Sequence, residues 1–418
     1  MRTGPGSGHS AGPAPFKGLH VLLLTSGFPP VVGGAETYAA TLAAGLADLG
    51  HDVIVATDDA GDRAPGTADQ AGHRVWRLAQ YRELLADPSK LRWEQMVFGI
   101  LPELEDRLGG WRPDLVVANG LETTVLGRMA AYQFGVPLVG SYHEHAPEDE
   151  PFGEGKMALG YRYLAPDAVL AGSLSYQARA RRFLGEKRVH LIHHGVDTER
   201  FSPDRDGARM RARYGIGRGR TLVVTAGRLK SRKGQLDLIQ AFAVAAESTA
   251  HLVIAGSVSS ASLDYADQLN ARIADLDLRG RVTIDQRVLA ADMPELLAAA
   301  DIVAQPSHSE GLGLALLEAM SSARPCVATR IAGHAEIFSA AAQARDVTPG
   351  DLVELVEPRD VNAIADALKR LQADDARRAA LGIAARDHVT RYFSQRMMIK
   401  RTDALLRDIV TRRRREDR

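Results

Sequence analysis

Short apolar runs alternate with amphipathic stretches along almost the whole chain, and this alternation restricts the fold more than any other feature. Such runs suit strands buried on both faces, because helices cover each side of a parallel sheet. The pattern runs once through the first half of the chain and then restarts, which predicts two doubly wound α/β domains. We expect strands at 19–24, 52–56, 114–118, 137–140, 168–171 and 189–192, and then at 222–225, 252–255, 282–284, 302–304 and 326–328.

The length of 418 residues also fits two domains of about 200 residues each. A Gly-, Pro- and Ser-rich tail is expected at 1–15, and the Rossmann-like domains at 16–200 and 201–394. A final helical segment, 395–418, is expected to return to the first domain. The other helices are predicted at 36–49, 235–246, 263–276, 293–299 and 313–321, with one or two more within 81–108.

Composition excludes several classes of protein. Lys plus Arg and Asp plus Glu number 52 each, so no overall field attracts nucleic acid, which is not expected as a partner. The single cysteine, Cys326, allows no disulfide within one chain. The tail lacks the apolar region of a signal peptide, and no run approaches the roughly 18 apolar residues of a membrane span. We therefore expect a cytoplasmic protein.

The segment 307–318, Ser-His-Ser-Glu-Gly-Leu-Gly-Leu-Ala-Leu-Leu-Glu, follows a predicted strand and opens a helix. Its glycines let a ligand approach the backbone, and free amides at a helix start suit phosphate. Glu310 lies in the loop and Glu318 about two helical turns later, so the two carboxylates suit a sugar and a ribose on either side of a diphosphate. The alternative is a helix-capping Glu310 and an exposed Glu318.

Two further loops precede helices. In 227–234, Arg228 and Lys233 would direct two cations at a ligand above the sheet, as a leaving diphosphate requires. The alternative is a solvated basic turn. Gly33 and Gly34 in the first domain form a weaker phosphate-binding signal.

Together these segments resemble the GT-B glycosyltransferases, specifically family 4 of the retaining enzymes. The resemblance covers nearly the whole chain, and its most specific feature is the pair of glutamates eight residues apart, Glu310 and Glu318. The stretches 195–197, 227–229 and 233–234 also lie where the family has them. One departure is His194, where relatives usually have Asn.

The resemblance implies roles for these residues. Arg228 and Lys233 would neutralise the diphosphate, Glu318 would hold the ribose hydroxyls, and Glu310 would contact the transferred sugar. The phosphates would also meet Gly33, Gly34 and the amides of Gly311, Leu312, Gly313 and Leu314, and the nucleobase would meet the backbone at Arg287 and Val288.

His143 follows a predicted strand and matches a histidine that the family places near the reacting sugar. Without the resemblance, a core or capping histidine is the default interpretation. The stretch 143–145, His-Glu-His, supplies at most part of a metal site. The Asp-x-Asp stretches 204–206 and 275–277 are expected on the surface. No metal ion and no resident cofactor are expected.

The resemblance implies a hexosyltransferase of the metal-independent, retaining class, with a UDP- or GDP-sugar as donor. The second domain would bind the donor, and the first a small hydroxyl acceptor. The leaving diphosphate would accept the acceptor's proton on the face where attack occurs. The alternatives are a nucleotide-sugar epimerase of the same fold, a lipid or cell-envelope glycosyltransferase, and a non-catalytic sugar-nucleotide sensor. A dinucleotide-dependent oxidoreductase is disfavoured because no G-x-G-x-x-G follows the first strand.

Charge clusters suggest two further interpretations. The acidic loop after His143 suits a cationic acceptor, such as an aminocyclitol or amino sugar. The alternative interpretation is that this loop is ordinary solvated surface. A basic helix after Ser173 and the run 412–415 would suit anionic lipid, but zero net charge makes membrane contact the less favoured interpretation. The acidic residues are Glu144, Glu148, Asp149, Glu150 and Glu154, and the basic ones are Arg179, Arg181, Arg182, Lys187 and Arg188.

Overall fold

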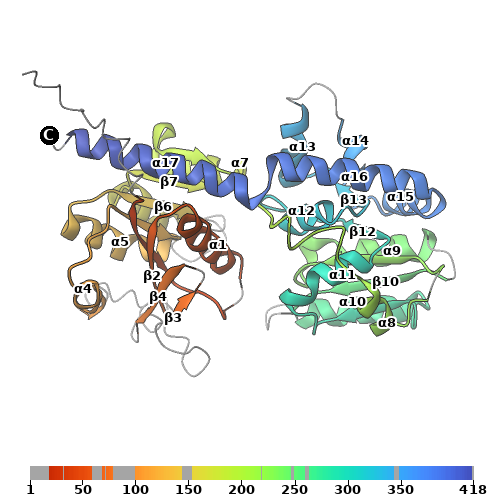
Figure 1. Ribbon diagram of the computed structural model, residues 1–418. Helices are drawn as coiled ribbons and strands as arrows, with labels where there is room; N and C mark the ends of the chain where they lie inside the picture. The colour runs from red at the N-terminus through yellow and green to blue at the C-terminus, as the bar shows by residue number, and fades with distance from the viewer. Residues whose placement is uncertain are drawn as a thin grey trace, which may run out of the picture. The chain divides into compact units, whose positions relative to one another are not determined.

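The computed structural model divides into two compact units (Figure 1). The first unit comprises Met1–Ser141, Gly155–Ala168 and Leu405–Arg418, and the second comprises Tyr142–Glu154 and Val169–Ala404. Within them, the structure describes residues 18–31, 33–58, 68–70, 72–78, 99–143, 153–217, 219–245, 249–258, 263–342 and 348–416. The tail predicted at 1–15 lies outside the described residues, and the predicted domain boundaries stay predictions.

An eight-stranded sheet has the order β3-β4-β2-β1-β5-β6-β7-β8. β1 pairs in parallel with both β2 and β5, so the chain changes direction across the sheet at β1, and the loop after β1 lies at this switch point. The strands are β1 (His20–Thr25), β2 (Asp52–Asp58), β3 (Ala68–Gln70), β4 (His73–Leu78), β5 (Leu115–Asn119), β6 (Leu138–Tyr142), β7 (Ala168–Ala171) and β8 (Val189–Leu191). The helices are α1 (Gly34–Asp48), α4 (Leu101–Leu108), α5 (Leu121–Phe134), α6 (Gly153–Met157), the π-helix η5 (Ala158–Tyr163), α7 (Leu174–Leu184) and the 3-10 helix η6 (Glu186–Arg188).

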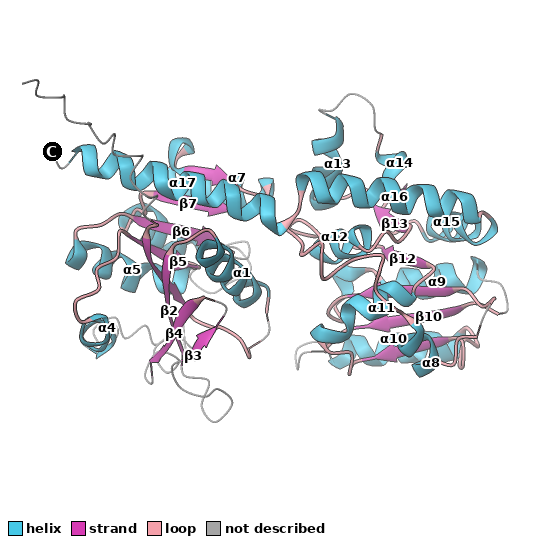
Figure 2. Ribbon diagram, in the orientation of Figure 1, coloured by secondary structure: helices cyan, strands magenta, loops and turns pink. Residues whose placement is uncertain are grey.

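The second unit contains a six-stranded parallel sheet of order β11-β10-β9-β12-β13-β14. Its strands are β9 (Leu222–Ala226), β10 (His251–Ala255), β11 (Val282–Asp285), β12 (Ile302–Gln305), β13 (Cys326–Thr329) and β14 (Glu354–Val356). Successive residues of β9 enter opposite cores: Val223 packs with helices that follow β9 and β10, and Val224 packs on the other face. Figure 2 shows the helices around these strands.

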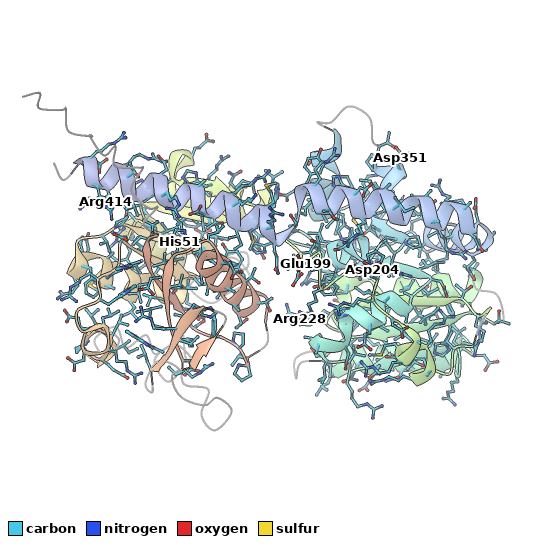
Figure 3. The ribbon with its side chains drawn as sticks, in the orientation of Figure 1. His51, Glu199, Asp204, Arg228, Asp351 and Arg414 are labelled. Carbon is cyan, nitrogen blue, oxygen red and sulfur yellow. The ribbon has the colours of Figure 1, made fainter. Side chains whose placement is uncertain are left out.

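The helices of this unit are α8 (Ala208–Arg213), α9 (Gln235–Ala245), α10 (Leu263–Asp275), α11 (Met293–Ala299), α12 (Leu314–Ser321), α13 (Ala332–Ala342), α14 (Pro349–Leu352), α15 (Val361–Ala373), α16 (Asp375–Tyr392) and α17 (Gln395–Glu416), with 3-10 turns η7 (Ser231–Lys233) and η9 (Ala290–Asp292). From residue 405 onward, α17 belongs to the first unit. There Arg407 Nη2 lies 2.9 Å from His51 Nε2, and Arg414 pairs with Asp114 (Figure 3).

The expected fold class is confirmed, and the predicted strands agree with the observed ones to within two residues at each end. In the second sheet the strand order reverses between β9 and β12, which pair side by side. Ligands of doubly wound sheets bind at such a switch point, beyond the carboxyl ends of the strands. The loops after β9 and β12 are therefore where a ligand of this unit is expected.

Candidate active site

Two loops meet at the switch point of the second sheet. The loop 227–234 after β9 is called the lysine loop here, and the loop 306–313 after β12 the glutamate loop. The amide of His308 donates to the Arg232 carbonyl at 2.7 Å. Gly234 has a φ of +69°, and a Cβ atom there would lie 2.0 Å from the Pro306 carbonyl oxygen. Only glycine allows this approach, so the backbone itself holds the two loops together.

The side chains of the two loops form a buried ionic cluster around Glu310. Lys233 Nζ lies 2.5 Å from Glu310 Oε1, and Ser307 Oγ donates to the same oxygen at 2.8 Å. Arg232 Nη1 donates to Glu310 Oε2 at 3.1 Å. The Glu310 side chain is 10% exposed and that of Lys233 14%. Glu310 therefore binds cations of the neighbouring loop and leaves α12 without a side-chain cap.

Burial alone would raise the pKa of Glu310, but the charge and hydrogen bond of Lys233, with Ser307 and Arg232, hold it below its usual range. Glu310 is therefore ionised at neutral pH. Burial also lowers the pKa of Lys233, an effect that Glu310 opposes and the positive charges of Arg232 and Arg228 reinforce. Arg228 itself is exposed (Figure 3). The cluster thus carries an excess of positive charge, as an anion-binding site requires.

Glu318 lies on α12 and is half-buried, so the interpretation of an exposed helical glutamate is wrong. Burial raises the pKa of Glu318 to about 7, although Arg200 and Lys233 act in the opposite direction. This carboxyl group changes its charge near neutral pH.

The glutamate loop also supplies a helix N-terminus. α12 begins at Leu314, and its N-cap residue is Gly313 with a φ of 99°. Gly313 offers no side chain to the amides of the first turn, so the helix end can receive an anion. A Cβ atom at Gly313 would lie 2.8 Å from His334 Cδ2, and one at Gly311 would lie 3.1 Å from the Tyr176 hydroxyl. Leu312 is buried beside them.

Arg287 and Val288 follow β11 in the same unit. The Arg287 amide donates to Asp285 Oδ1 at 2.9 Å, and its side chain is 89% exposed. Val288 packs against the hydrophobic core. A pocket of about 560 Å³ opens here, lined by Arg213, Tyr214, Thr283, Ile284, Asp285, Gln286 and Arg287. Asp285 is buried and also accepts hydrogen bonds from Arg213 Nη2 at 2.6 Å and from the Tyr214 hydroxyl at 3.1 Å.

His143 directly follows β6, and its ring packs on His194 with centroids 5.4 Å apart. Burial, with the nearby charge of His194, lowers the pKa of His143 to about 3, and burial lowers that of His194 to about 4. Both rings are neutral at physiological pH. The Tyr176 ring packs on His194 at 6.5 Å. Most of the acidic loop, including Glu144 to Glu150, lies outside the described residues.

Gly33 and Gly34 lie at the start of α1 in the first unit, at the switch point of the other sheet. A Cβ atom at Gly33 would lie 2.0 Å from Glu36 Oε2, so the Glu36 side chain folds back against Gly33. The other predicted donor-site residues lie in the second unit.

The structure adds residues that the sequence did not single out. These are Arg232 and Ser307 around Glu310, and Asp237, whose Oδ2 lies 2.6 Å from His308 Nε2. Their only signal in the sequence is that they are adjacent to, or within a few residues of, Lys233 and Glu310.

Neither Asp-x-Asp stretch forms a buried carboxylate pair. Asp204, Asp206, Asp275 and Asp277 are all exposed. Across the described ranges, no group of three His, Cys, Asp or Glu side chains is arranged to hold a metal ion.

In the part of the chain that the structure describes, no helix combines the length and apolarity that crossing a membrane requires. Several arginines of the basic segments have carboxylate partners. Arg182 Nη2 lies 2.8 Å from Glu154 Oε1, and Arg412 pairs with Asp408. Such pairing reduces the charge available to an anionic lipid surface.

Known proteins resemble this chain along both units. Residues 206–388 match the model of the glycosyl transferases group 1, and residues 32–200 match that of glycosyltransferase family 4. The GDP-mannose-dependent alpha-(1-6)-phosphatidylinositol monomannoside mannosyltransferase of Mycolicibacterium smegmatis is 30% identical over 88% of this chain and 92% of its own. The D-inositol 3-phosphate glycosyltransferase of Xylanimonas cellulosilytica is 30% identical over 85% and 87%. Anabaena Alr3699/HepE, solved with UDP and glucose, has a TM-score of 0.71 and 23% identity over 93% of this chain and all of its own.

Proposed function

The chain belongs to family 4 of the GT-B glycosyltransferases, and from that premise we propose that it transfers a hexose from a nucleotide-diphosphate sugar, with retention and without a metal ion. The observation that carries this proposal is the pair of Lys233 and Glu310, with Arg228 in the same lysine loop, beside the N-terminus of α12. Cations and helix amides at one switch point suit a diphosphate.

In this proposal the protein stabilises charge and supplies no nucleophile of its own. Arg228, Lys233 and the amides of residues 311–314 neutralise the diphosphate as its bond to the sugar breaks. Gly33 and Gly34 are assigned to the same diphosphate. The departing phosphate oxygen accepts the proton of the acceptor hydroxyl, which attacks on the same face. Glu310 contacts the sugar, and neutral His143 donates a hydrogen bond near the reacting carbon.

The donor is assigned to the UDP- or GDP-sugars, with the nucleobase at the backbone of Arg287 and Val288. One relative is named as GDP-mannose-dependent, and Alr3699/HepE was solved with UDP. Both support a nucleotide donor and leave the base open.

The first experiment is a panel of UDP- and GDP-sugars, with and without hydroxyl acceptors, in which nucleotide release and the anomeric configuration of the product are measured. We expect release that depends on acceptor, retains the configuration and persists in a chelator. Release of free nucleotide or a rearranged sugar without acceptor would favour the epimerase instead. A requirement for manganese, or inversion, would contradict the mechanism.

Glu318 makes donor binding depend on pH. The ribose hydroxyls donate best to an ionised carboxylate, and burial raises the pKa of Glu318 to about 7. As the pH falls through 7 the ionised fraction falls, so the donor KM is expected to rise about tenfold between pH 8 and pH 6. The Glu318→Gln variant should show a raised but flat KM. If the donor KM of the wild type did not change with pH, or changed equally in the wild type and in Glu318→Gln, Glu318 would have no role in binding the ribose.

The acceptor is proposed to be a small cyclitol or sugar hydroxyl compound. One relative is named for D-inositol 3-phosphate, which supports a cyclitol, whereas the other is named for a phosphatidylinositol monomannoside. The acidic stretch from Glu144 to Glu154 adds the expectation of an amine-bearing acceptor. Competition between an aminocyclitol and its N-acetyl form tests this, and the amine is expected to react at least tenfold more efficiently. Equal efficiency would leave the loop without a role in recognition.

A further inference from the structure

Arg232 makes three hydrogen bonds to the glutamate loop. Its Nη1 donates to the Ser309 carbonyl at 2.8 Å and to Glu310 Oε2 at 3.1 Å, while its own carbonyl accepts the His308 amide at 2.7 Å. Both the side chain and the main chain of Arg232 are therefore hydrogen-bonded to the glutamate loop.

The two oxygens of Glu310 have different partners. Oε1 accepts from Lys233 and Ser307, whereas Oε2 accepts from Arg232. The Lys233 ammonium is a compact charge on a flexible stem and can turn, while the Arg232 guanidinium is planar and bonded at two points. The two cations can therefore separate without losing both contacts to Glu310.

Donor binding requires this separation. In the proposed function the Lys233 ammonium contacts the diphosphate, yet here it lies 2.5 Å from Glu310. When Lys233 turns to the phosphates, Glu310 would remain as a carboxylate with only 10% of its side chain exposed. A buried carboxylate without a cation is strongly unfavourable. Because Arg232 binds Glu310 Oε2, the carboxylate keeps one cation when Lys233 leaves.

Two contacts hold the backbone that leads into Glu310, so the exchange can be confined to side chains. His308 Nε2 lies 2.6 Å from Asp237 Oδ2, and Gly234 lies against the Pro306 carbonyl. The loops need not move for Lys233 to change partners.

We propose that Arg232 is a positioning residue that keeps Glu310 charged and oriented while Lys233 exchanges Glu310 for the donor diphosphate. The inference rests on the proposed function, and it assigns Arg232 to Glu310 and not to the donor. Arg232 then matters for nucleotide binding only because Glu310 carries a charge.

A double-mutant cycle with Glu310→Gln tests this dependence. The Kd of UDP and GDP is measured by calorimetry for the wild type, Arg232→Ala, Glu310→Gln and the double variant. Arg232→Ala is expected to raise the Kd about tenfold in the wild-type background and less than about twofold in the Glu310→Gln background. Arg232→Lys should recover most of the affinity, because the charge is kept.

Arg209→Ala is the control, because the guanidinium of Arg209 also binds carboxylates, those of Asp292 and Glu295, but Arg209 lies outside the lysine and glutamate loops. Its Kd should equal that of the wild type. An equal effect of Arg232→Ala in both backgrounds would assign Arg232 to the nucleotide itself, and no effect in either would show that Glu310 needs no second cation. Both results overturn the inference and leave the proposed function standing. A wild type that binds neither nucleotide and transfers no sugar would overturn the proposed function and, with it, this inference.

Discussion

Replacing Lys233 by alanine is expected to lower turnover about a hundredfold, equivalent to about 3 kcal/mol of transition-state stabilisation. The negative charge on the diphosphate grows as the sugar departs, so a cation in contact with it contributes more in the transition state than in the bound donor. The site is largely buried, and its low dielectric strengthens the interaction. We therefore expect the loss mainly in kcat and less in the donor KM.

Lys369→Ala is the matched control, because Lys369 also pairs with a carboxylate, Asp366 at 3.6 Å, but does so on the surface of α15. Its turnover should stay within threefold of the parent. Initial rates at saturating acceptor over a range of donor concentrations separate kcat from KM. Turnover of Lys233→Ala within threefold of the parent would show that the ammonium does not contact the leaving group.

The strands that could be predicted from the sequence are those whose burial is recorded in continuous apolar runs. β9, Leu222–Ala226, is buried throughout and reads as one such run. β4 is not predictable in this way because His-Arg-Val-Trp-Arg-Leu mixes charged and apolar residues, and β14 is not because it spans only three residues, one of them Glu354. Glu354 is buried because Arg370 and Arg377 bind its carboxylate, a tertiary compensation that no local pattern reveals.

In the candidate site, too, some features could be predicted from the sequence and others could not. Lys233 and Glu310 stood out in the sequence through their loops and their resemblance to the family, but their contact spans 77 residues and could not be predicted. The packing of His143 on His194 is likewise a product of the fold. Periodicity and turn chemistry identify which residues lie in a loop after a strand. Which loops then touch depends on the order of strands in the sheet.

Replacing Gly234 by alanine is expected to destabilise the second unit far more than the same change at Gly215. Both residues have a left-handed φ, +69° at Gly234 and +65° at Gly215, so an added side chain meets a similar backbone strain of about 1 to 2 kcal/mol at each. They differ in their surroundings. A Cβ atom at Gly215 would meet nothing within 4 Å, whereas one at Gly234 would lie 2.0 Å from the Pro306 carbonyl oxygen.

That contact involves two backbones, so no side chain can rotate away, and the lysine and glutamate loops must separate. Overpacking of this kind adds about 3 kcal/mol to the destabilisation caused by Gly234→Ala. This variant should therefore lower the Tm by about 10 °C more than Gly215→Ala does. Thermal unfolding of the two variants measures this difference, and the shared φ strain cancels in it. Because Pro306 leads into Ser307 and Glu310, Gly234→Ala should also lose affinity for UDP and GDP at temperatures where it is folded, and Gly215→Ala should keep it. Equal Tm values for the two variants would mean that the loops can part without cost, and the close backbone contact would then not be what holds Glu310 beside Lys233.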